Sequence, residues 1–198
     1  MDVEETPKKK KEKKEKREGG SRAQPSQPAV EATNIEKILF RVGKIVEVGR
    51  HPDADGLYVE KIDVGEEQPR QILSGLVKFI PIEQMQDRRI IVCCNLKPAK
   101  MRGIMSYGMV LCAENDGKTV VEFVEPPEDA NIGDRICVEG VEYRCEPEAQ
   151  LNPKKKVWDK VAEELRVDSE GFATYEGKKL HIAGKYLTAP TVREGVIR

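Results

Sequence analysis

The chain contains no apolar run near the roughly 18 residues that a membrane-spanning helix requires. Its N-terminus begins with acids and lysines instead of an apolar leader segment. Its five cysteines are an odd number, and none stands in a CxxC pair or at zinc-ligand spacing with a histidine. These absences argue against a membrane span, a secretory signal, a disulfide framework and a zinc site. They predict a reducing, cytoplasmic setting.

Signatures of catalysis are also missing. There is no GxSxG and no glycine-rich loop that follows a strand and opens a helix, and only two histidines occur among the 198 residues. Residues 181–184 (HIAG) resemble the HIGH motif of class I aminoacyl-tRNA synthetases, and residues 100–103 (KMRG) resemble their KMSKS loop. Here the two motifs stand in reverse order, without a βαβ nucleotide-binding domain. We therefore predict no enzyme activity and no cofactor.

One segment invites a metal interpretation. In residues 51–55 (HPDAD), two carboxylates stand near a histidine and could bind a cation. Pro-Asp and Asp-Gly sequences are also ordinary turn chemistry. A structural turn is the preferred interpretation, and no metal site is predicted.

Charge is distributed unevenly along the chain. Residues 1–33 hold 9 basic and 7 acidic side chains, and residues 8–17 alone hold 8 of those bases. Such a segment cannot bury enough surface to fold alone, so we predict a disordered lysine-rich tail and linker. This tail either keeps the protein soluble or attracts RNA.

The remaining chain is nearly neutral overall, with two segments of opposite charge. Residues 88–113 contain five bases and no acid, whereas residues 114–148 contain 11 acids and three bases. A stretch of one sign inside a nearly neutral domain suggests a local anionic partner.

Six short runs rich in Val, Ile and aromatic residues predict strands, and Gly, Pro and Asp clusters separate them. A proline-initiated short helix is predicted at 81–86, between the third and fourth strands. This layout is typical of a five-stranded OB-fold barrel over residues 34–140, with a β-sandwich as the alternative. The predicted strands are 38–48, 57–64, 71–74, 89–96, 104–113 and 119–124.

Residues 141–198 have a different pattern. Asn152 and Pro153 are suited to start a helix, and the apolar residues at 157, 158, 161 and 165 fall on one helical face. A hairpin is predicted for 172–182, with its turn at Glu176 and Gly177. The region is small, so we expect its apolar face to pack on the barrel. The overall prediction is an all-β-dominated fold with minor α content.

The strongest functional signal is the loop of residues 95–103 (NLKPAKMRG), which leads to Ser106. It carries three cations and no acid between two predicted strands. Cations on such a loop suit phosphate contacts, while Asn95, Met101 and Ser106 could reach a base edge, a base face and a backbone oxygen. A solvated basic loop without a partner is the competing interpretation.

Seven motifs, in order, resemble the endothelial-monocyte-activating polypeptide II family of tRNA-binding domains. The resemblance runs from about residue 35 to the C-terminus. It implies a non-catalytic OB-fold that binds tRNA and works with aminoacyl-tRNA synthetases or in the multi-synthetase complex. The motifs are 41–45 (RVGKI), 51–55 (HPDAD), 57–60 (LYVE), 62–65 (IDVG), 74–77 (SGLV), 95–103 and 151–156 (LNPKKK).

The resemblance also implies site residues and an oligomeric state. Bacterial relatives dimerise through the barrel, and the longer eukaryotic type imitates that interface with its C-terminal extension, so a monomeric pseudo-dimer is expected. The alternative function is a protein-interaction scaffold or a released cytokine-like factor. The expected tRNA contacts are Asn95, Lys97, Lys100, Met101, Arg102 and Ser106, with Arg41, Lys44, Arg50, His51 and Lys78 as weaker candidates on the barrel face.

Overall fold

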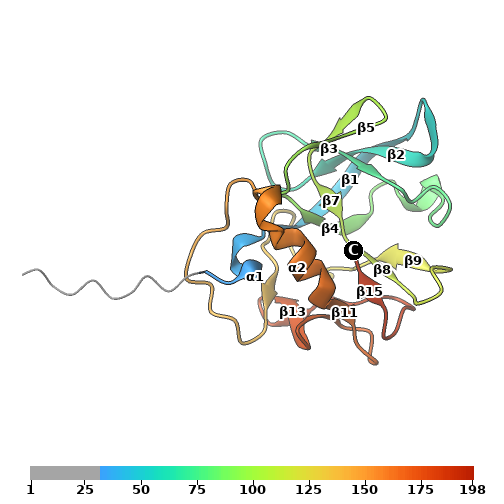
Figure 1. Cartoon of the computed structure of the whole chain (residues 1–198). Helices are drawn as coiled ribbons and strands as arrows, with labels where there is room; N and C mark the ends of the chain where they lie inside the picture. The colour runs from blue at the N-terminus through green and yellow to red at the C-terminus, as the bar shows by residue number, and fades with distance from the viewer. Residues whose placement is uncertain (1–31) are drawn as a thin grey trace, which may run out of the picture. The chain divides into compact units, whose positions relative to one another are not determined.

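The computed structural model describes residues 32–198, shown in colour in Figure 1. The predicted lysine-rich tail lies outside the described residues, apart from its last two positions. The first described element is the short helix α1 (Asn34–Lys37). Its N-terminus is closed by a capping box, in which Glu36 accepts hydrogen bonds from the backbone N–H and the hydroxyl of Thr33.

A five-stranded antiparallel sheet forms the barrel, in the order β3-β2-β1-β4-β7. The predicted OB-fold barrel is confirmed by this sheet. The predicted helix at 81–86 is a single 3₁₀ turn, η1 (Ile82–Gln84), between β3 and β4. The strands are β1 (Phe40–His51), β2 (Ala54–Asp63), β3 (Arg70–Ser74), β4 (Arg89–Cys93) and β7 (Met109–Val110).

The fifth predicted strand, at 104–113, is divided into three short ones. These are β6 (Ile104–Ser106), β7 and β8 (Cys112–Glu114). The division falls beside Gly108, where the backbone lies too close to residues of β3 and β4 to leave room for a side chain. A Cβ at this position would lie 2.9 Å from Ile72 Cδ1 and 3.0 Å from the Cys93 carbonyl oxygen.

A second sheet joins the barrel to the C-terminal region. Its order is β10-β13-β12-β11-β15-β8-β9, and β14 pairs with β13. The last strand of the chain, β15, pairs with β8, so the C-terminal region is hydrogen-bonded to residues 112–114 that follow the barrel strand β7. The other strands of this second sheet are β9 (Val121–Phe123), β10 (Cys137–Val138), β11 (Leu165–Val167), β12 (Ala173–Tyr175), β13 (Lys178–Ile182), β14 (Lys185–Tyr186) and β15 (Val196–Ile197).

The predicted C-terminal hairpin is confirmed as β12 and β13. Tyr175 pairs with Lys178 across the two-residue turn. Glu176 and Gly177 in that turn have φ of 49° and 73°. Positive φ at both central positions is what a type I′ hairpin turn requires, because its twist matches that of the strands.

The predicted helix is α2 (Val157–Glu164), and it starts one turn later than the Asn-Pro pair. Asn152 Oδ1 accepts a hydrogen bond from the Lys154 N–H at 3.0 Å, so it caps the 3₁₀ turn η2 (Pro153–Lys155). The helix buries Val157 and Val161. Next to them, Trp158 meets the Phe40 ring edge-on, with centroids 6.4 Å apart.

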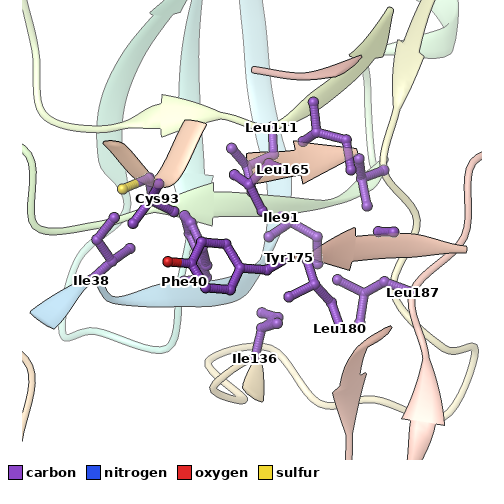
Figure 2. Close-up of a cluster of buried hydrophobic side chains, with 14 of the residues drawn as sticks. Ile38, Phe40, Ile91, Cys93, Leu111, Ile136, Leu165, Tyr175, Leu180 and Leu187 are labelled. Carbon is purple, nitrogen blue, oxygen red and sulfur yellow. The ribbon is translucent and has the colours of Figure 1, made fainter. Parts of the chain in front are cut away.

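Strand β4 is buried on both faces, which explains its unbroken apolar run. Ile90 and Val92 point into the barrel interior. Ile91 and Cys93 point the other way, into a core shared with the C-terminal region. Figure 2 shows Ile91 in one cluster with Leu165 of β11. The C-terminal region therefore covers the outer face of the barrel.

All five cysteines are free, and Cys93, Cys94 and Cys112 are buried. Burial raises the pKa of Cys94 to about 11. Among residues 32–198, no helix has both the length and the hydropathy needed to cross a membrane.

Candidate nucleic-acid interface

The basic loop folds into a two-stranded hairpin of β5 (Ala99–Met101) and β6 (Ile104–Ser106). Met101 pairs with Ile104, which leaves Arg102 and Gly103 as a two-residue turn. Their φ angles are 49° and 92°, again both positive. In Figure 1 this hairpin projects from the end of the molecule opposite β11 and β13. The fold thus presents Arg102 at the tip of a projecting hairpin.

The three cations of this loop are exposed and available. Lys97, Lys100 and Arg102 all face solvent. Within the part of the chain that the structure describes, none of them forms an ion pair. We call these three side chains the hairpin cations. Because no acidic side chain of residues 32–198 lies within ion-pair distance of them, these cations are available to an external anion.

Two residues of β3 anchor the base of the hairpin, and sequence reasoning missed both. Gln71 Nε2 donates to the Met105 carbonyl at 2.8 Å, and the Tyr107 N–H donates to the Gln71 carbonyl at 2.9 Å. Arg70 donates to the Tyr107 carbonyl at 3.0 Å and to the Cys94 carbonyl. These contacts join positions 24 to 37 residues apart in the sequence, so no local sequence pattern predicts them.

Arg70 is itself held by an acid. Its guanidinium forms a paired hydrogen bond with Glu66, at 2.7 Å and 2.6 Å. This interaction holds the pKa of Glu66 below its usual value. The hairpin base is therefore fixed by a charged pair, a geometry that keeps the guanidinium plane in one orientation.

Asn95 is buried, and its side chain links segments of the fold. It is 2% exposed, and its Oδ1 accepts from the Leu39 N–H at 3.0 Å. Its Nδ2 donates to the Lys37 carbonyl at 2.8 Å and to the Glu148 carbonyl at 2.7 Å. The amide therefore ties three segments together, and both ends of it are occupied within the fold.

Ser106 is also engaged inside the fold, since its hydroxyl accepts from the Leu73 N–H at 3.0 Å and donates to the Gly108 carbonyl at 3.1 Å. Met101 is half-buried and lines a cavity beside the hairpin. Ser106 lines the same cavity, so of the six loop residues expected to contact RNA, all but Asn95 lie at the surface or line this cavity.

The weaker candidates on the barrel face are scattered. Lys44 pairs with Asp87 at 3.0 Å, and Arg41 lies 4.0 Å from Glu66. Arg50 and Lys78 are exposed and line one cleft of about 300 Å³. Of the five weaker candidates, Arg50 and Lys78 are the two that are exposed and form no ion pair within residues 32–198, and Glu83 lines the same cleft.

His51 belongs to a turn. It is 4% exposed, and its Nδ1 accepts a hydrogen bond from the Asp53 N–H at 3.0 Å. This local hydrogen bond shows that residues 51–55 contain the turn between β1 and β2, as the preferred interpretation of the sequence predicted. Across residues 32–198, no group of three or more His, Cys, Asp or Glu side chains could hold a metal ion.

Comparison with known families agrees with these features. Residues 40–135 match the family described as "Putative tRNA binding domain". The C-terminal domain of Plasmodium vivax p43 superposes with a TM-score of 0.77 at 34% identity, over 83% of this chain and 98% of that one. The chain therefore belongs to this family of tRNA-binding domains.

Three curated relatives show where such domains occur. The cytoplasmic methionine–tRNA ligase of Caenorhabditis elegans is 48% identical over 84% of this chain and 18% of the ligase. Aminoacyl tRNA synthase complex-interacting multifunctional protein 1 of Cricetulus griseus is 47% identical over 77% of this chain and 41% of that protein. The cytoplasmic tyrosine–tRNA ligase of Danio rerio is 49% identical over 79% of this chain and 30% of the ligase. The chain spans less than half the length of each.

Proposed function

We propose that this protein is a non-catalytic module that delivers or retains tRNA for an aminoacyl-tRNA synthetase in the cytoplasm. The observation that carries the proposal is the set of hairpin cations, which are exposed and lack ion pairs in the described part of the chain. The relatives that share this domain are two tRNA ligases and a protein named for its interaction with the synthetase complex.

The mechanism is electrostatic capture. Lys97, Lys100 and Arg102 contact backbone phosphates, while Arg50 and Lys78 extend the cationic surface across the barrel face. Phosphate contacts position a nucleic acid and carry little base information, so recognition depends mainly on the shape of the tRNA. Binding by counterion release is strongly weakened by salt.

The absence of a synthetase active site is supported by where the two synthetase-like tetrapeptides lie. His181 is on β13, where its Nδ1 accepts a hydrogen bond from the Gly184 N–H at 3.1 Å in a local turn. Lys100 is on β5, at the opposite end of the molecule in Figure 1. The two motifs share no site around which adenylate chemistry could be organised.

The division into a barrel at 34–140 and an extension at 141–198 is part of the proposal. The extension buries barrel residues such as Phe40, Ile91 and Leu111 in a common core. Such a face would otherwise be apolar and exposed, as dimer interfaces are. The proposed state is therefore a monomer whose extension occupies the position of a second subunit.

The test is tRNA binding at a series of salt concentrations. The logarithm of the binding constant falls as the logarithm of the salt concentration rises. Replacement of Lys97, Lys100 and Arg102 by Ala should make this slope shallower by about 0.7 to 0.9 per residue. A control variant with Lys154, Lys160 and Lys178 replaced by Ala loses the same number of exposed charges outside the hairpin. Equal slopes for both variants would reject the hairpin as the site. Association with a synthetase that survives nuclease and the triple replacement would instead favour the scaffold function.

A further inference from the structure

A cavity of about 420 Å³ opens directly beside the hairpin. This volume is in the range of sites that take small ligands. Its walls are predominantly apolar, and they are contributed by β3, by the segment after it, by the hairpin and by β7 to β9. The main apolar contributors are Leu73, Leu76, Phe79, Leu96, Met101 and Met109. An open apolar cavity in a domain whose surface is largely charged requires an explanation.

The rim of this cavity is cationic on the side of the hairpin. Lys97 lines it, and the chain then continues into the hairpin that carries Lys100 and Arg102. Phe79, which is 40% exposed, lines both this cavity and the cleft that contains Arg50 and Lys78. An aromatic face thus stands between two cationic sites. That combination matches how proteins bind unstacked nucleotides, with bases on apolar faces and phosphates on cations.

One wall of the cavity includes a polar residue. Ser74 lines the cavity, and its hydroxyl donates a hydrogen bond to Glu60 Oε1. Glu60 has no solvent exposure, and its Oε2 has no hydrogen-bond partner among the described residues. Because Glu60 does not line the cavity, the group on this wall that a nucleobase edge can use is the Ser74 hydroxyl oxygen, which can still accept a hydrogen bond.

We propose that this cavity takes one unstacked nucleobase of the bound tRNA, while the hairpin cations hold the adjacent phosphates. This inference rests on the proposed function and extends it from phosphate contact to single-nucleotide recognition. A fully paired RNA has no base to offer, so the cavity distinguishes tRNA from a plain duplex.

The cavity can be filled without disturbing the fold. Gly75 lines it, and a Cβ built on Gly75 meets nothing within 4 Å. Gly75 is not among the glycines with positive φ, so a side chain is compatible with its backbone. Gly75→Leu therefore adds an apolar side chain at the lining of the cavity without displacing a neighbour. Gly49→Leu is the matched control, because Gly49 has equally free space and does not line this cavity.

The experiment compares these variants against intact tRNA and against a blunt RNA duplex of similar length. Gly75→Leu should weaken tRNA binding about 5- to 150-fold, the range for loss of one stacked base. Its affinity for the duplex should equal that of the wild type, and Gly49→Leu should behave as wild type with both ligands. Phe79→Ala is a second variant for the case in which Gly75→Leu does not fold, with the same expected pattern.

Several results would overturn the inference. One is an unchanged tRNA affinity of Gly75→Leu while the triple hairpin variant loses binding; this result leaves the proposed function intact. Another is an equal loss for tRNA and duplex, which would mean a general perturbation. A third is saturable binding of free adenosine monophosphate that Gly75→Leu abolishes without changing tRNA affinity. A fourth is loss of association with a purified synthetase alone, which would make the cavity a protein-binding site.

Discussion

The hydroxyl of Ser74 on β3 donates a hydrogen bond to the buried carboxyl of Glu60 on β2. Burial raises the pKa of Glu60 from an ordinary value of 4.5 to about 8, and the hydrogen bond from Ser74 offsets only part of that rise. The carboxyl is therefore protonated at neutral pH in the folded protein. In the unfolded chain it is ionised under the same conditions.

This difference predicts how stability depends on pH. From about pH 5 to about pH 8, the folded state keeps a proton that the unfolded state has released. The free energy of unfolding should therefore fall as pH rises, by about 1.4 kcal/mol per unit. Urea unfolding at a series of pH values measures the slope. Glu60→Gln should flatten it, and parallel curves for the two proteins would contradict the assignment.

Other acids act in a different pH range. Hydrogen bonds from Thr33 lower the pKa of Glu36, and those from Arg70 lower the pKa of Glu66. The stability that these two groups contribute is present above their ordinary value of 4.5 and is lost as pH falls through their lowered values. The slope assigned to Glu60 is measured above that range.

The position of Asn95 predicts a mutation that separates structure from binding. Asn95→Ala leaves the Leu39 N–H and the Lys37 and Glu148 carbonyls without their partner. Unsatisfied buried groups of this kind should lower the free energy of unfolding by about 2 to 4 kcal/mol. At a temperature where the variant is still folded, its tRNA affinity should equal that of the wild type. Lys100→Ala is the reciprocal control, with unchanged stability and weaker binding. A folded Asn95→Ala protein that binds tRNA much more weakly would show a direct contact.

The hairpin turn predicts an effect of geometry on binding. Gly103 has φ of 92°, a region that β-branched residues avoid, so Gly103→Val should strain the turn by about 1 to 3 kcal/mol. The strain changes the direction in which Arg102 projects, and tRNA affinity should fall. Gly56→Val is the control, because a Cβ there meets nothing within 4 Å and its φ is not positive. Equal affinities of the two variants would mean that the shape of the turn does not matter.

The shared core predicts what happens without the extension. A chain ending at residue 140 exposes Phe40, Ile91 and Leu111, which are 3%, 0% and 0% exposed in the whole chain. Removal of a cover from a contiguous apolar face of this kind should cause self-association. Sedimentation equilibrium of residues 32–140 against 32–198 measures it. A truncated protein that stays folded and monomeric would contradict the pseudo-dimer proposal.

Local sequence patterns predicted most of the barrel and the C-terminal hairpin. The clusters of β-branched residues predicted four strands of the five-stranded sheet, with only small changes at their ends. Glu176 and Gly177 correctly predicted the turn of the C-terminal hairpin. The errors arose where neighbours in space overrode local preference. The run at 104–113 looks like one strand, but a Cβ at Gly108 would lie within about 3 Å of the Ile72 side chain and the Cys93 carbonyl oxygen, and the strand is interrupted there.

At the candidate site, charge could be predicted and burial could not. Lys97, Lys100 and Arg102 lie on the surface as their charge requires, because ionised side chains are costly to bury. Asn95 and Ser106 are polar residues that can be either exposed or satisfied internally. Only the positions of their partners distinguish these outcomes.

The sequence by itself determined the strand-rich domain, the basic loop at 95–103, the C-terminal hairpin turn and the family to which the chain belongs. These features depend on residues close together along the chain, where charge, side-chain branching and glycine act locally. Only the tertiary structure decided that Arg70 and Gln71 support the hairpin, that Asn95 joins segments 53 to 58 residues away, and that an apolar cavity opens beside Lys97. Such relationships arise from long-range packing, because a buried polar group must find its partner wherever the fold places one.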